Sequence, residues 1–321
     1  MSRLQEVYLG LDVGGTNIAG ALVDKEGIIV KQVKLPTRAR EGQDVVVSQM
    51  CRAITLLLGH AEQNEFYVQG IGMGIPGPVS VKEGISLHSP NLFWDNVPIR
   101  DIIQQQFSLP VAMDNDVRCA AIGEKFFGAG KVAKDVICVT LGTGVGSGIF
   151  INNHLFRGFR DIAGEIGHIT MNPRGPKCNC GKNGCLEAYV GAPNISRRAK
   201  EAIFNQKYSV IVEMVNGNLA DITPEMVHRA ALAGDELAKN IIQETAELIG
   251  LALSYMANLF NPQLIIVGGG VARSGEMLIN PIRDTIKANA MREHGKILTV
   301  VPAQLGEDAG MIGAAWLLNA D

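Results

Sequence analysis

The sequence predicts an α/β protein with two domains that face each other across a cleft. The chain has 321 residues, which is enough for two hydrophobic cores. Segments with the pattern of strands alternate with segments of helical spacing. A strand, a loop rich in glycine and threonine, and a returning strand occur near the start of the chain and again in its middle. This weak internal repeat indicates two duplicated α/β domains.

Apolar runs predict the strands of the first part of the chain, and helical spacing predicts its helices. The strands are Val7–Asp12, Asn17–Val23, Ile28–Lys34, Gln69–Gly74 and Leu109–Asp114. The helices are Asp44–His60 and Val117–Phe127. A rigid turn, Ile75-Pro76-Gly77-Pro78, follows the fourth of these strands, because proline restricts the backbone on both sides of it.

The same patterns continue in the second part of the chain. Its predicted strands are Val136–Leu141, Gly148–Ile151, Leu264–Val267 and Leu298–Ala303. Its predicted helices are Ala192–Asn205, Thr223–Ala233, Asp235–Phe260, a helix after Gly270, and Ala309–Asn319. No low-complexity linker separates the two parts.

The composition excludes several classes of partner. Hydrophobic residues make up 47% of the chain, charged residues 19%, and the formal net charge is −3. This charge gives no basic surface for nucleic acid or an anionic membrane. The uncharged runs 136–156 and 248–272 are interrupted by glycine, asparagine or proline, so neither predicts a membrane span. No signal peptide precedes the first strand, and we expect a cytoplasmic protein.

A cluster of cysteines with one histidine predicts a structural zinc site. Its ligands would be His168, Cys178, Cys180 and Cys185, a Cys₃His set that tetrahedral zinc accepts. Glu165 and Glu187 flank these ligands without being needed for the metal, so the metal would brace a polar pocket. The alternatives are a free-standing zinc ribbon and thiols clustered by chance. The remaining cysteines, Cys51, Cys119 and Cys138, lie in apolar segments and should be buried.

Three glycine-rich loops are candidates for nucleotide binding. Asp12-Val13-Gly14-Gly15-Thr16-Asn17 and Leu141–Gly148 each follow a strand, and their backbone N–H groups would form an anion nest. Either alone is more often a hairpin turn, and neither has the features of a P-loop or a dinucleotide fingerprint. As a pair they favour a phosphate chain held between two domains. Gly268-Gly269-Gly270 would lie beside the nucleoside, or else form a close helix–strand contact.

The run Asp114-Asn115-Asp116 ends a strand and begins a helix. Capping the helix is the structural alternative, since Asn and Asp favour the N-cap position. Capping needs one such residue, so the run favours a polar ligand contact. A carboxylate at a helix N-terminus also stays charged more easily, which suits a general base.

Taken in order, these motifs resemble the ROK family (repressors, open reading frames and kinases), and within it the bacterial ATP-dependent glucokinases. The resemblance extends from about Tyr8 to Leu317. It implies an actin-like or hexokinase-like ATPase fold of two α/β domains. The first domain would be residues 1–117, completed by a C-terminal helix at about 305–321. The second would be residues 118–304, with the zinc knuckle at 168–185.

The resemblance also implies a glycolytic transferase that moves a phosphoryl group from ATP to the 6-hydroxyl of a hexose, with glucose preferred. Asp116 would be the catalytic base and Asn115 would hold neighbouring hydroxyls. The other sugar-binding residues would be Gly77, Asn91, Glu165, His168 and Glu187. One ring nitrogen of His168 would bind zinc and the other would face the sugar.

For the cofactors, the resemblance implies ATP, Mg²⁺ and a structural Zn²⁺. Asp12 would help to hold Mg²⁺, and Thr16, Thr143 and Gly144 would face the phosphates. Gly14, Gly15, Asn17, Gly268, Gly269 and Gly270 would complete the nucleotide site. A homo-oligomer, dimer or tetramer, is also implied.

Several alternatives stay open within and beyond this resemblance. The acceptor can instead be N-acetylmannosamine, N-acetylglucosamine, fructose or allose, and the donor can be polyphosphate. Asp114 stands where relatives often carry Glu, while Ser147 and the run Gly191-Ala192-Pro193 are also unusual. A sugar-sensing regulator is less favoured, because its DNA-binding domain would need room before Asp12. A zinc-ribbon interaction protein would leave Asn115, Asp116 and the paired glycine loops unexplained.

Overall fold

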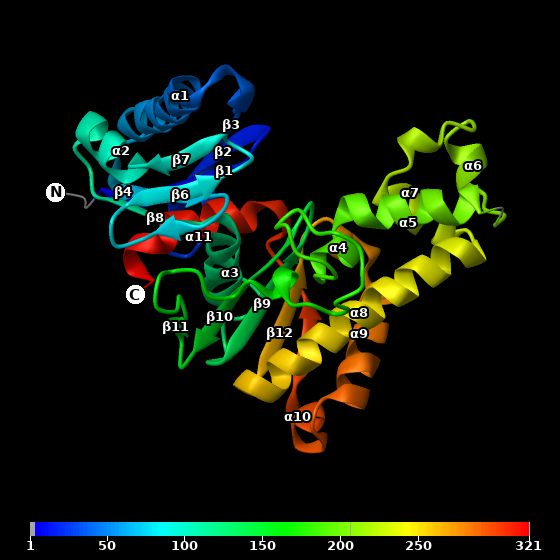
Figure 1. Ribbon diagram of the computed structural model, residues 1–321. Helices are drawn as coiled ribbons and strands as arrows, with labels where there is room; N and C mark the ends of the chain where they lie inside the picture. Colours follow the sequence, from blue (N-terminus) through cyan, green and yellow to red (C-terminus); the bar gives the residue numbers. More distant parts are fainter. Residues whose placement is uncertain (1–3, 206, 321) are drawn as a thin grey trace. The chain divides into compact units, whose positions relative to one another are not determined.

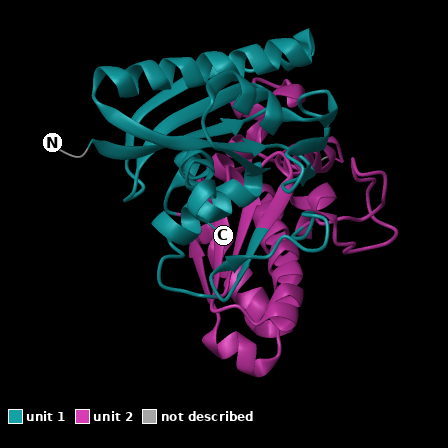
Figure 2. Ribbon diagram, turned by 90° about the vertical axis from the view of Figure 1, so that its left-hand side faces the viewer, with its two compact units in different colours: residues 1–134, 148–164, 304–321 teal, residues 135–147, 165–303 magenta. Residues whose placement is uncertain are grey.

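The computed structural model describes residues 4–205 and 207–320 (Figure 1). The chain forms two compact units, which Figure 2 shows in different colours. Unit 1 comprises Met1–Lys134, Gly148–Gly164 and Gln304–Asp321. Unit 2 comprises Asp135–Ser147 and Glu165–Ala303. Each unit has its own sheet and its own helices, and each is described by itself below.

The sheet of unit 1 brings three strand ends to one edge. Its order is β3-β2-β1-β4-β8. The strands are β1 (Gln5–Val13), β2 (Asn17–Asp24), β3 (Ile29–Pro36), β4 (Phe66–Ile75) and β8 (Val111–Asn115). The first three are antiparallel, whereas β4 and β8 run parallel to β1. Asp12 is therefore in register with Gly74, and Gly74 with Asp114.

Helices cover this sheet and bury its apolar side chains. They are α1 (Gln43–Gln63), α2 (Ile99–Phe107), α3 (Asp116–Phe127) and α11 (Ala309–Trp316). Helix α1 packs on β2 and β3, while α11 packs on α3, β1 and β4. Apolar residues at strand and helical spacing, among them Leu9, Leu11, Ile54 and Ile71, are fully buried. A small second sheet is formed by β5 (Val79–Ser80), β6 (Ile85–Ser89) and β7 (Trp94–Val97).

Parallel strands also organise unit 2. Strand β12 (Leu264–Gly268) lies between β9 (Val136–Leu141) and β13 (Thr299–Pro302), parallel to both. The full order of this sheet is β11-β10-β9-β12-β13. Strand β10 (Val145–Ile151) begins in unit 2, and its later residues belong to unit 1 together with β11 (His154–Leu155). Because β9 and β12 are parallel neighbours, the loops that follow them leave from the same edge.

The helices of unit 2 surround a long central one. They are α4 (Glu187–Val190), α5 (Ala192–Phe204), α6 (Ile211–Met214), α7 (Pro224–Leu232), α8 (Glu236–Phe260), α9 (Glu276–Asn289) and α10 (Arg292–Ile297). Helix α8, yellow in Figure 1, packs against α5, α7 and α9. Asp235 caps α8 by accepting a hydrogen bond from the Ala238 N–H at 2.8 Å. Among the described residues, no helix is both long and apolar enough to cross a membrane.

Short 3₁₀ turns complete the structure. They are Ala39–Glu41, Ile166–His168, Leu219–Asp221, Val271–Ser274, Gly306–Asp308 and Leu317–Asn319. The predicted final helix, Ala309–Asn319, therefore ends as an α-helix at Trp316. Its last residues form a tighter turn.

The other predicted strands and helices are present, with bounds shifted by a few residues. Eight short elements were not predicted from the sequence: β5, β6, β7, β11, α2, α4, α6 and α10. Cys51, Cys119 and Cys138 are buried, as predicted. Helix α3 and residues 148–164 belong to unit 1, beyond the domain limit expected at residue 117, and the domain division stays a prediction.

Candidate active site

Asn115 is the N-cap of α3 and holds the predicted base. Its Oδ1 accepts hydrogen bonds from the N–H groups of Val117 at 3.0 Å and Arg118 at 3.2 Å. Its Nδ2 donates to the Gly77 carbonyl at 3.1 Å and to Asp116 Oδ1 at 2.9 Å. These contacts use both donors of the amide and both lone pairs of its oxygen. Asn115 thus fixes the start of the helix, the turn at Gly77 and the carboxylate of Asp116.

Asp116 lies half-buried in the first turn of α3. Burial raises the pKa of its carboxyl group. Hydrogen bonds from Val117 N–H, at 2.9 Å, and from Asn115 act in the opposite direction and keep the carboxylate oriented. A fixed carboxylate with a raised pKa is suited to accept a proton from a hydroxyl group.

Asp12 lies near the end of β1, close to the carboxylate of Asp116. Burial, and then the negative charge of Asp116, raise the pKa of Asp12 to about 7. Its Oδ2 lies against Gly310 at the start of α11, where a Cβ would come within 2.5 Å. Two carboxylates that repel each other form a donor set that a divalent cation stabilises. This chemistry fits the Mg²⁺ ligand predicted at Asp12.

The first glycine loop is a closed turn with an open outer face. Gly14 N–H donates to the Asn17 carbonyl at 2.9 Å, and the Thr37 hydroxyl donates to the Gly14 carbonyl at 2.6 Å. Thr16 and Asn17 are exposed. Gly15 lies against Asn91, so that a Cβ at Gly15 would be 3.1 Å from the Asn91 Cβ. The structure thus places a predicted phosphate-binding residue beside a predicted sugar-lining residue.

In unit 2, Glu187 links the second glycine loop to the cysteine cluster. Its Oε2 accepts a hydrogen bond from the Val145 N–H at 3.0 Å. Its Oε1 lies 3.8 Å from Cys178 Sγ. Gly144 leaves room for this carboxylate, because a Cβ there would lie 2.6 Å from Oε2. The position of Glu187 therefore depends on the loop predicted to face the phosphates.

The ring of His168 lies between a carboxylate and a thiol. Its Nε2 is 3.9 Å from Glu165 Oε2, and its Nδ1 is 3.7 Å from Cys178 Sγ. The turn that carries both residues is closed by a hydrogen bond from His168 N–H to the Glu165 carbonyl at 3.0 Å. The two ring nitrogens thus face different partners, and Nδ1 is the one directed at the cysteines.

The predicted zinc ligands converge. The ligand atoms of His168, Cys178, Cys180 and Cys185 all lie within 4.8 Å of one another. Cys180 Sγ and Cys185 Sγ are 3.6 Å apart. In a tetrahedral site with Zn–S bonds of about 2.3 Å, two sulfur ligands are about 3.8 Å apart. The donor set and its spacing therefore fit zinc.

A cavity of about 590 Å³ joins the second and third glycine loops. Gly142 and Thr143 line it from one side and Gly270 from another. Apolar side chains from α5, α7, α8 and α9 form much of its walls: Ile195, Val227, Ile242 and Leu278. Its size is that of a small-molecule site. These wall residues were not predicted from the sequence, because they come from helices far apart in the chain.

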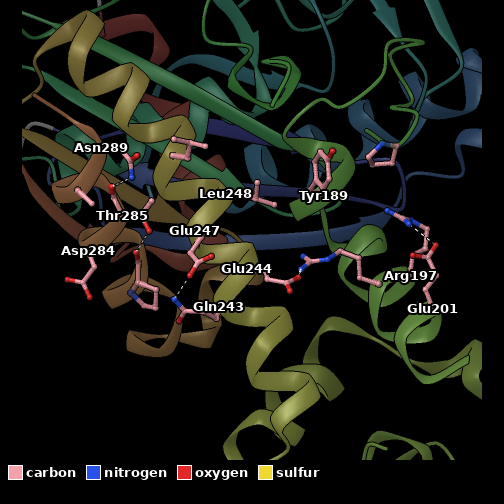
Figure 3. Close-up of a pocket in the computed structure, with 15 residues that line it drawn as sticks. Tyr189, Arg197, Glu201, Gln243, Glu244, Glu247, Leu248, Asp284, Thr285 and Asn289 are labelled. Carbon is pink, nitrogen blue, oxygen red and sulfur yellow. Dashed lines mark hydrogen bonds and ion pairs between the residues drawn. The ribbon is translucent and has the colours of Figure 1, made fainter. Parts of the chain in front are cut away.

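Another hollow in unit 2, of about 1000 Å³, contains none of the predicted site residues among those that line it (Figure 3). It lies on α5, α8 and α9. Four of its charged groups form two ion pairs: Arg197 with Glu201 at 2.7 Å and Arg198 with Glu244 at 2.5 Å. Gln243 also donates to Glu247 at 2.8 Å. We therefore do not include this hollow in the candidate active site.

Comparisons with known proteins identify the fold. A crystal structure of a ROK family glucokinase from Streptomyces griseus, in complex with glucose and AMPPNP, has a TM-score of 0.83 to this chain and is 38% identical. The match covers 96% of this chain and 98% of that one. The protein thus has the actin-like ATPase fold of the ROK sugar kinases, as predicted.

The family follows from the sequence comparisons. The ROK family model matches residues 8–321. The glucokinase of Halalkalibacterium halodurans is 37% identical over 313 residues, which are 97% of this chain and 94% of the relative. A xylose repressor of Caldicellulosiruptor bescii is 32% identical, and the match covers 98% of this chain and 78% of the repressor. The chain belongs to the ROK family.

Proposed function

We propose that the protein transfers the terminal phosphoryl group of ATP to the 6-hydroxyl group of a hexose, with glucose as the preferred acceptor. The observation that carries this proposal is the geometry of Asp116. Its carboxylate lies in the first turn of α3, is held by Asn115, and has a raised pKa. The relatives named glucokinase support the same activity.

Asp116 would take the proton of the attacking hydroxyl as the new bond to phosphorus forms. Phosphoryl transfer passes through a loose transition state, so alignment of the hydroxyl contributes more than the strength of the base. Glu165, the free nitrogen of His168 and Glu187 would bind further sugar hydroxyls. This role is supported by the orientation of the His168 ring, since Nδ1 is directed at Cys178 and Nε2 at Glu165. Asn115 would act mainly by holding Asp116.

The glycine loops would hold the phosphates of ATP through their backbone N–H groups. The cavity beside Thr143 and Gly270 would receive the nucleoside, because its walls are largely apolar and it opens beside both loops. Asp12 would help to hold Mg²⁺, which neutralises phosphate charge when it is bound.

Zinc would be held by His168, Cys178, Cys180 and Cys185 in a structural site, since all four ligands come from the protein. It would fix the tautomer of His168 and the start of α4, where Glu187 lies. The thiols must stay reduced for this role, which supports a cytoplasmic protein. A homo-oligomer is part of the same proposal, and light scattering on the purified protein measures its mass.

Sugar-dependent release of ADP from Mg-ATP tests the proposed reaction. The same assay on the Asp116→Asn variant tests the role of Asp116 as the base. Loss of a general base should lower kcat at least ~10²-fold. The amide can still donate to a hydroxyl group, so part of the glucose affinity should remain. Asp44→Asn, an exposed change of the same type on α1, is the control and should keep wild-type turnover. Near-wild-type turnover of Asp116→Asn would remove the catalytic role from this residue.

A further inference from the structure

Asp114, the residue before the Asn115-Asp116 pair, is the centre of a buried cluster of charges in unit 1. Its side chain is fully buried. Oδ1 accepts a hydrogen bond from Arg118 Nε at 2.5 Å, and Oδ2 accepts one from Arg157 Nε at 2.8 Å. The Arg118 side chain is only 4% exposed and that of Arg157 16%. One carboxylate thus joins two arginines from distant parts of the chain.

These arginines hold the loop of residues 156–164. Arg157 belongs to the loop, and Arg118 Nη1 donates to the carbonyl of Asp161 at 2.6 Å. Asp161 has a left-handed backbone conformation, with φ of 58°, and its Oδ2 accepts from Val81 N–H at 3.0 Å. The loop closes on itself through a hydrogen bond from Ala163 N–H to the Arg157 carbonyl at 3.0 Å. It is thus anchored at Arg157 and again at Asp161.

The same cluster is bonded to the catalytic corner. Asp114 Oδ1 also accepts a hydrogen bond from the Asn115 N–H at 2.7 Å. Arg118 lies in the first turn of α3, and its N–H is capped by the Asn115 side chain, which in turn holds Asp116. Both arginine anchors of the loop therefore lead, within two hydrogen bonds, to Asn115, which orients Asp116.

Stability alone does not account for this cluster. Burying charged groups carries a desolvation penalty that their mutual attraction often fails to exceed, and apolar replacements of similar volume are commonly as stable. In addition, Arg118 Nη2 is buried without a hydrogen-bond partner in the described part of the chain. Charged side chains fix the direction of a contact, because hydrogen bonds specify geometry, whereas apolar side chains do not.

We propose that Asp114, Arg118 and Arg157 are positioning residues that clamp the 156–164 loop to the end of β8 and so hold Asp116 in its working orientation. The inference rests on the proposed function only for its effect on catalysis. The clamped loop is also the segment through which the chain leaves unit 1, since Gly164 is its last residue there. Residues 157–161 are therefore fixed in unit 1, a few residues before the predicted sugar ligand Glu165.

Hydrogen exchange tests the clamp without any substrate. Arg157→Gln removes the charge that meets Asp114 Oδ2, and Asp114→Asn weakens both arginine contacts. Both variants should accelerate exchange of the 156–164 amides and cleavage by chymotrypsin after Phe159, whose side chain is 98% exposed. Arg160→Gln, an exposed arginine in the same loop, is the matched control and should exchange like the wild type. Unchanged exchange in Arg157→Gln would overturn the clamp.

Kinetics test the positioning role. Misplacement of a reacting group by about 1 Å can lower the rate about 10²-fold, so Arg157→Gln should lower kcat about tenfold or more. The KM for ATP should change little, and Arg157→Lys, which keeps the charge, should recover part of kcat. A loosened loop with wild-type kcat would overturn the positioning role. The exchange experiment does not depend on the proposed function. If the wild type phosphorylated no hexose, the proposed function would be wrong, and hydrogen exchange would still test whether Arg157 and Asp114 hold the loop.

Discussion

Gly144→Ala should weaken glucose binding by displacing Glu187. A methyl group at position 144 would lie 2.6 Å from Glu187 Oε2 and 3.5 Å from its Cδ, so the carboxylate must move. That movement breaks the hydrogen bond from Val145 N–H to Oε2, which is 3.0 Å long. Since Val145 follows Gly144 directly, the backbone has little freedom to follow the carboxylate.

The size of the effect follows from the bond that is lost. A hydrogen bond to a charged group contributes about 1.5–3 kcal/mol, and about 1.4 kcal/mol is a tenfold change in an equilibrium constant. If Glu187 binds a sugar hydroxyl in the position that this bond fixes, the Kd for glucose should rise about tenfold to a hundredfold. The turnover of bound sugar should fall less, because Asp116 lies in α3 of unit 1 and keeps its own contacts.

Calorimetric titration with glucose, without ATP, measures this effect directly. Gly142→Ala is the matched control, since no heavy atom lies within 4 Å of a Cβ built at that position. Its glucose affinity should equal that of the wild type. Zinc content must be measured for both variants, because Glu187 Oε1 lies only 3.8 Å from Cys178. Wild-type affinity in a zinc-replete Gly144→Ala variant would refute the role given to Glu187.

Two further predictions concern the metal and the pH dependence of stability. Cys185→Ser, purified without chelator, should lose the zinc that metal analysis finds in the wild type, and its glucose affinity should fall with it; an absence of zinc from the wild type would contradict the site. Asp12 has a pKa of about 7 in the folded protein against 3.8 for the ordinary group, so the folded state binds its proton more tightly. Without Mg²⁺, this residue should make the free energy of unfolding fall as pH rises from about 4 to about 7 and add no slope above that. The free energy of unfolding in urea is measured against pH for the wild type and for Asp12→Asn, and the difference between them isolates the contribution of Asp12. Equal pH slopes for the two proteins would contradict the prediction.

The sequence predicted the elements whose pattern is long and regular. Strands such as β1 and β9 are continuous apolar runs, and α8 keeps helical spacing over its whole length. The cysteine knuckle was equally predictable, because its ligands lie close together in the chain and their chemistry is specific. Strands β5 and β7 are too short to show a period, so the small sheet they form with β6 was missed.

The roles within Asp114-Asn115-Asp116 show where sequence reasoning ended. The sequence favours a polar ligand contact over capping for this run, with Asp116 as the base and Asn115 on the sugar, and it gives Asp114 no role. In the structure, Asn115 is the cap, Asp114 is buried between two arginines, and Asp116 alone is left as the candidate base. Arg157 lies far along the chain from Asp114, and no local pattern reveals such a pairing. Partners of this kind depend on tertiary packing, which a single sequence does not display.

The comparison of kcat/KM among hexoses with Mg-ATP tests the central claim most directly. The acceptors are glucose, mannose, fructose, allose, N-acetylglucosamine and N-acetylmannosamine. A site that binds each hydroxyl loses about 1–3 kcal/mol for every buried partner left unpaired, so glucose should exceed each alternative about tenfold or more. A tenfold preference for another sugar would contradict the assignment to glucose. The absence of sugar-dependent ADP release with every one of them would contradict the hexose kinase itself.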